Sequence, residues 1–136
     1  MSEILDNFYI ALKNCPSLSG CDIRKKDSFA AVKYPLRLPV VTIADRETKR
    51  SALCTGDGFF LEERSIAVSV CTAESMGAQN SRDCASLVCQ ALFAADSGRD
   101  IVSLSTDSTV YDGELGGFRT EFALGFRPVM VCEEDL

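Results

Sequence analysis

Hydrophobic residues recur at helical spacing in two stretches of the chain, which predicts two amphipathic helices. The first stripe lies in residues 4–14 and comprises Ile4, Leu5, Phe8, Ala11 and Leu12. Pro16 ends this stretch, because the residue before a proline is pushed out of the helical conformation. The second stripe lies in residues 80–96 and comprises Cys84, Leu87, Val88, Ala91 and Leu92. Asn80 or Ser81 is expected to cap its start, and Gly98 to end it in a left-handed turn.

Elsewhere hydrophobic and polar positions alternate with the two-residue period of β-strands. Strands are predicted at residues 38–44, 59–72, 101–111 and 118–127, with a short continuation at 129–132. In the second strand Ile66, Val68 and Val70 share one face. In the fourth, the shared face comprises Phe118, Thr120, Phe122, Leu124 and Phe126. We expect these two faces to form one core with the second helix.

The predicted order is helix, strand, strand, helix, strand, strand, with turn residues between consecutive strands. Such strands pair antiparallel, and the helices then cover one face of the sheet. We therefore expect an α+β fold with a single antiparallel, at most mixed, sheet of about four to five strands and two helices on one face. The 136 residues are expected to form a single domain, since domains cluster near roughly 100–150 residues.

Composition narrows the function classes. The net charge is −6, so the surface should repel a phosphate backbone. There is no histidine, which removes the usual general base and the commonest zinc ligand. The chain contains no apolar run long enough to span a bilayer, and its first residues do not resemble a secretory signal. We predict no membrane association and no specific nucleic-acid binding.

Seven cysteines are present, an odd number with no Cys-x-x-Cys pair. They are expected to be reduced, small core residues of a cytosolic protein rather than zinc ligands or catalytic thiols. The glycine-rich stretches at 56–58 and 113–117 lack phosphate-loop spacing and are interpreted as hairpin loops. We accordingly predict no catalytic residues, no cofactor and no metal site.

The whole pattern resembles the tail-terminator and tail-completion (neck) proteins of long-tailed bacteriophages and phage tail-like particles. Four segments carry the resemblance. They are the short first helix ending at Cys15-Pro16, the strand Leu38-Pro39-Val40-Val41-Thr42-Ile43, the strand at 66–73 that leads into a helix at 81–93, and the closing aromatic strand at 117–127.

The resemblance implies a structural virion protein that forms a ring on the end of the tail tube. The ring is expected to be a hexamer of identical subunits. Such a ring ends tail polymerisation and then docks the head-side connector where a capsid exists, or closes a headless particle. The implied partners are further copies of the chain, the tail tube, the sheath protein and the connector, and DNA can pass through the lumen. The implied location is the virion tail or neck, with assembly in the bacterial cytoplasm.

Two alternatives remain open at this point. The chain could be a small cytosolic α+β enzyme or ligand-binding domain with a pocket between helix and sheet. It could also be another ring protein of the virion, such as a head–tail adaptor.

Two stretches, Asp45–Gly58 and Asp112–Gly117, are interpreted as long polar or glycine-rich loops without a role in the core. Loops of this kind commonly carry the function of a rigid scaffold. We therefore predict contacts to neighbouring subunits and to the tube at nine residues: Asp45, Arg46, Arg50, Leu53, Asp57, Phe59, Phe60, Asp112 and Leu115.

Overall fold

A computed structural model describes residues 2–25, 38–52 and 58–132 of the chain. Within these residues it contains two α-helices, α1 (Ser2–Lys13) and α3 (Ala78–Ala94). The strands are β1 (Asp22–Lys25), β2 (Val40–Ala52), β3 (Phe59–Ala73), β4 (Ile101–Thr106), β5 (Val110–Asp112), β6 (Gly117–Phe126) and β7 (Val129–Cys132). Three short 3₁₀ helices connect them: η1 (Pro16–Leu18), η2 (Glu74–Met76) and η3 (Asp96–Asp100).

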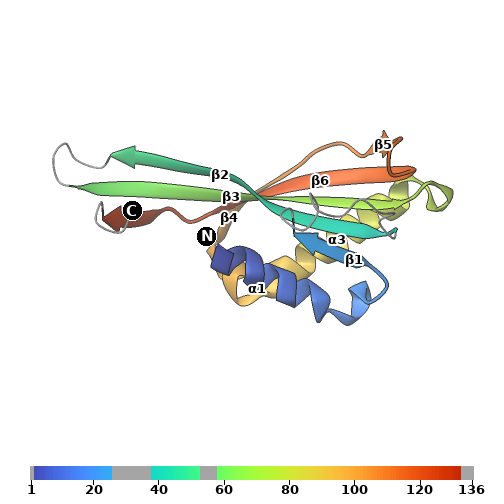
Figure 1. Ribbon diagram of the computed structural model, residues 1–136, viewed down its shortest axis with the longest axis horizontal. Coiled ribbons are helices and arrows are strands. Elements are labelled where there is room, and N and C mark those ends of the chain that lie inside the picture. Colours follow the sequence, from blue (N-terminus) through green and yellow to red (C-terminus); the bar gives the residue numbers. More distant parts are fainter. Residues whose placement is uncertain (1, 26–37, 53–57, 133–136) are drawn as a thin grey trace.

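The seven strands of the described chain form one mixed, open sheet in the order β1-β2-β3-β6-β4. β5 pairs with the start of β6, and β7 pairs with the start of β3. Only β1 and β2 are parallel among the pairs of described strands. Both helices lie on the same face of the sheet, and the opposite face has no helix over it (Figure 1). The predicted α+β class with helices on one face is therefore confirmed.

The strand number exceeds the four to five that were predicted, for identifiable reasons. β1 has only four residues, three of them charged, and therefore shows no hydrophobic alternation. The segment predicted as one strand at 101–111 is divided into β4 and β5 by residues 107–109. The amide of Asp107 still donates to the carbonyl of Glu121 at 2.9 Å, so both strands follow the same side of β6.

The core lies between the sheet and the two helices. Ile66, Val68 and Val70 of β3 are buried, and they join the buried Phe122, Leu124 and Phe126 of β6 in one hydrophobic cluster. Side chains from the helices complete this cluster: Leu5, Phe8, Leu12, Ala85, Val88 and Leu92. The predicted shared core is confirmed for these residues, whereas Phe118 is half-buried outside the cluster and contacts the ring of Tyr111.

The ends of α3 differ from the prediction. The helix begins at Ala78, directly after Gly77, whose φ of 83° favours glycine. Ser81 is not a cap, because its hydroxyl is buried and contacts the Thr120 hydroxyl at 2.8 Å. The helix ends at Ala94, and Gly98 lies within η3 without a positive φ. Glycine is required there for space, since an added Cβ would overlap the carbonyl oxygens of Leu92 and Phe93.

Candidate functional site

The far half of the β2–β3 hairpin projects beyond both helices (Figure 1). We call residues 46–52 and 59–65 of this hairpin the arm. Asp45–Gly58 was predicted to be a loop, and this is wrong for residues 45–52, which continue β2 and pair with β3. The charged residues misled the prediction, because a strand with solvent on both faces needs no hydrophobic alternation. Register pairs such as Thr48 with Arg64 and Arg50 with Glu62 define the arm instead.

A buried carboxylate lies at the centre of the arm. Glu62 is only 3% exposed, and it accepts hydrogen bonds from Arg50 Nε at 2.9 Å and from Arg64 Nε at 2.6 Å. The two guanidinium groups hold the pKa of Glu62 below its ordinary value, with burial opposing them. Ile4 of α1, Phe126 and Val129 line the same pocket as Glu62 and Arg64. The register shift between Asp45 and Glu47 places Arg50 on the same helix-side face of the sheet.

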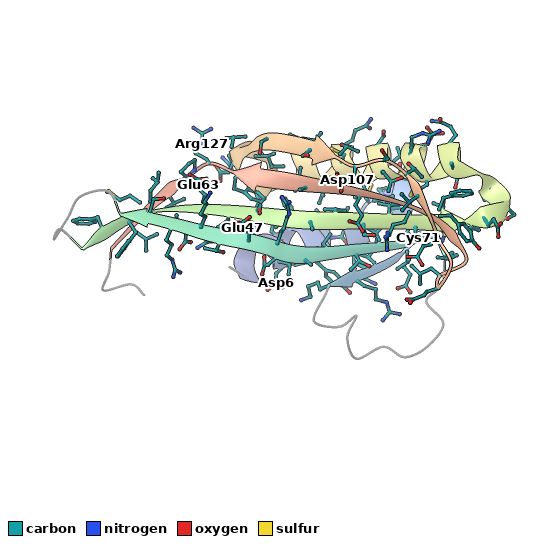
Figure 2. The ribbon with its side chains drawn as sticks, turned by 90° about the horizontal axis from the view of Figure 1, so that it is seen from above. Asp6, Glu47, Glu63, Cys71, Asp107 and Arg127 are labelled. Carbon is teal, nitrogen blue, oxygen red and sulfur yellow. The ribbon has the colours of Figure 1, made fainter. Side chains whose placement is uncertain are left out.

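The other charged residues of the arm are exposed. Arg46, Glu47 and Lys49 of β2 and Glu63 of β3 all reach solvent, and Figure 2 shows Glu47 and Glu63 along the arm. Within the described residues, no ion pair of Arg46 or Lys49 is formed. Lys49 lies directly opposite Glu63 across the two strands, so this face of the arm presents charges of both signs to a partner.

Next to the arm along the sheet, the helix-free face contains a groove of about 380 Å³. Its floor is made of small or apolar side chains of the two central strands: Val40, Thr42, Ala44, Ala67, Ser69 and Cys71. Its wall comprises Asp112, Glu114, Leu115, Arg119 and Glu121. We call this the acidic groove, because three carboxylates face one cation in the wall.

The wall of the acidic groove is built by the turn between β5 and β6. Asp112 Oδ1 accepts the amides of Glu114 and Leu115 at 3.0 and 3.1 Å, and Gly116 has a φ of 73°. Arg119 pairs with Asp112 at 2.8 Å and with Glu121 at 3.1 Å. Within the described chain, Glu114 has no such cationic partner.

A third surface runs along the outer edge of the sheet, formed by β4, β5 and β7. We call it the apolar edge. Six large hydrophobic residues there are 46–63% exposed: Val102, Leu104, Val110, Tyr111, Val129 and Met130. β4, with the sequence Ile-Val-Ser-Leu-Ser-Thr, contains no charged residue. The opposite edge, formed by β1 and the outer half of β2, is rich in charged residues, which is how natural sheets prevent unwanted pairing.

Burial sets the protonation state of four described cysteines. Burial raises the pKa values of Cys21, Cys71 and Cys89, and it raises that of Cys84 to about 12. These thiols are held in the neutral form, which is the weaker nucleophile and metal ligand. No group of three or more Cys, Asp or Glu side chains suited to a metal ion occurs among the described residues.

The structure distributes the predicted interface residues over two sites and does not bring them together. Asp45, Arg46, Arg50, Phe59 and Phe60 lie on or beside the arm, with Phe59 exposed and Phe60 half-buried. Asp112 and Leu115 line the acidic groove. Leu53 and Asp57 lie outside the described residues.

Sequence reasoning missed several residues of these surfaces. Lys49 of the arm and Glu114 and Glu121 of the groove were not among the predicted interface residues. Lys49 and Glu114 nevertheless lie inside the two predicted loops, Asp45–Gly58 and Asp112–Gly117. The apolar edge was also missed. The uncharged sequence of β4 could have indicated it, since edge strands usually carry charge.

No protein-family model matches this chain, and no curated protein matches it at a significant level. Among the described residues, neither helix combines the length and the hydrophobicity needed to cross a bilayer.

Proposed function

We propose that this protein is a structural virion protein that caps the tail tube as a ring, in the manner of the tail terminators that its sequence resembles. The ring ends tube growth and presents a docking surface to the head-side connector, or closes a headless particle. The ring is a homohexamer by the same resemblance. No chemical reaction is part of this role.

The observation that carries the proposal is the apolar edge. A monomeric domain rarely leaves many large hydrophobic residues exposed along unpaired strand edges, because such an edge recruits other chains. Here β4 and β7 contain no charged residue and β5 contains only Asp112, whereas the other edge is protected by charge. This contrast favours a protein that functions in an assembly, and we assign the apolar edge to the contact with the tube.

Two further features support an assembly role over an enzyme. The larger grooves are shallow surfaces of the sheet, of about 350 and 380 Å³, and neither is an enclosed site. The buried carboxylate Glu62 is kept ionised by two arginines, which suits it poorly to exchange protons near neutral pH.

Electron microscopy of cognate tail tubes tests the proposal. Tubes polymerised with the protein should stop at a defined length and carry a ring at one end, whereas tubes without it should grow to variable length. Uncapped tubes of unchanged length distribution would contradict the role. A ring that binds isolated head connectors and ignores tubes would instead favour the head–tail adaptor alternative.

A further inference from the structure

The arm differs in charge from the rest of the chain. Residues 46–51 contain the cations Arg46, Lys49 and Arg50 and one carboxylate, Glu47, so this segment has a net charge of +2. The complete chain has a net charge of −6. Glu62 engages Arg50 and Arg64, and the exposed Glu47 and Glu63 accompany Arg46 and Lys49. The arm as a whole therefore has four cations and three carboxylates, a net charge of +1.

The acidic groove carries the opposite charge. Its wall contains Asp112, Glu114 and Glu121 against Arg119, which amounts to a net charge of −2. Arg119 is already shared between Asp112 and Glu121. An occupant of the groove therefore needs to be cationic, and the apolar side chain of Leu115 can pack on the aliphatic stem of a lysine or arginine.

The arm cannot fill the groove of its own subunit. The floor of the groove extends along β2 from Val40 to Ala44, and residues 46–51 continue the same strand beyond it. A strand segment rises by about 3.3 Å per residue, so it cannot fold back over a floor formed by the residues directly before it. Only a second copy of the chain can bring this cationic segment to this acidic groove.

We infer that residues 46–51 of one copy occupy the acidic groove of the next, and that this contact repeats around the ring. The inference rests on the proposed function and names the subunit interface of that assembly. A ring requires two different patches on each subunit, because its contacts run head to tail. The arm and the groove are two such patches, of opposite net charge, on one sheet.

Charge reversal at each patch tests the inference. The arm variant is Arg46→Glu with Lys49→Glu, and the groove variant is Glu114→Lys with Glu121→Lys. Asp112 and Arg50 are left intact, since Asp112 holds the turn and Arg50 holds Glu62. A control for the arm variant is Arg82→Glu with Arg99→Glu, which changes net charge equally at two exposed sites on α3 and η3.

Sedimentation velocity of the full chain measures assembly, alone and with tail tubes present. Each reversed variant should lose about a hundredfold or more in self-association, because like charges then face each other. The control should assemble like the wild type. A chain that carries both reversals should assemble again, and so should an equimolar mixture of the two variants, since opposite charges meet once more.

Several outcomes would overturn the inference. These are a wild type that stays monomeric alone and on tubes, reversed variants that assemble normally, and a double variant or mixture that does not recover. A closed dimer in place of a larger ring would also contradict the head-to-tail arrangement. Rings that recover by charge exchange but never cap tubes would leave the interface standing and remove the tail-terminator function. If the wild type caps tubes and the reversed variants cap them equally well, the proposed interface is wrong and the tail-terminator function stands.

Discussion

Arg50 and Glu62 face each other across the two strands of the arm, joined by a hydrogen bond of 2.9 Å from Arg50 Nε to Glu62 Oε2. Arg64 completes the arrangement from the next position on the same face of β3. These ion pairs join β2 to β3 and help to fix the register of the arm. The pairing of β7 with residues 59–62 of β3 supports the arm further.

Neutralising this carboxylate should loosen the arm without unfolding the body. In Glu62→Gln, two arginines lose their shared counter-charge, and arm amides should exchange with solvent about tenfold faster or more. Amides of β3 between Ile66 and Val70 should keep their protection. Glu63→Gln is the matched control, since Glu63 is exposed and its change should leave exchange unaltered. Equal exchange in the two variants would contradict the assigned role.

The same carboxylate should make stability depend on acid pH. The pKa of Glu62 is lowered in the folded protein, so its stabilising contribution is present above the unfolded value of about 4.3. It is lost as the pH falls through the lower folded value. Urea unfolding is measured at steps of about one pH unit from about pH 6 down to about pH 3. Over this range the free energy of unfolding should decline less for Glu62→Gln than for the wild type. Parallel declines would mean that other carboxylates cause the acid sensitivity.

The shared core predicts a large effect of a single aromatic truncation. Phe122 is 4% exposed and packs in the cluster between the sheet and α3, so Phe122→Ala should cost about 3–5 kcal/mol of unfolding free energy. Phe93→Ala removes the same group from a side chain that is 44% exposed, and it should cost less than about 1 kcal/mol. Chemical denaturation measures both. A loss below about 1 kcal/mol for Phe122→Ala would place this face outside the core.

Particular residues show how far the sequence predicted the fold. Alternation placed Phe122 and Val68 correctly, because a face buried against helices must be hydrophobic at every second residue. Leu87 was wrongly assigned to the buried stripe of α3, since helix α1 covers a neighbouring sector of that helix and leaves Leu87 exposed. Residues 45–51 of β2 are all exposed, so this stretch has no hydrophobic period to detect. Its partner groove depends on pairing between β3 and β6, which no local pattern reveals.

Gly98 offers a second test of packing. Gly98→Ala would bring a methyl group against the carbonyl oxygens of Leu92 and Phe93, at the turn from α3 into η3. This overlap should cost about 1–3 kcal/mol of unfolding free energy. Gly20→Ala is the control, because an added Cβ there meets no atom within 4 Å. Similar stability of the two variants by thermal unfolding would contradict the close approach at Gly98.

The last prediction concerns the apolar edge. Leu104→Lys with Val129→Lys places two charges on the edge formed by β4 and β7, and both side chains are already exposed, so the fold should persist. Charged residues on an edge strand prevent it from pairing with another chain, so tube capping should be lost. Self-association through the arm and the acidic groove should remain, because neither patch is altered.

Ile10→Lys with Met76→Lys is the matched control, since it adds the same charge at exposed hydrophobic residues of α1 and η2. In electron micrographs, control subunits should cap tubes and edge variants should form free rings beside uncapped tubes. Normal capping by the edge variant would assign the tube contact to another surface, because a hydrophobic contact along this edge could not tolerate two lysines.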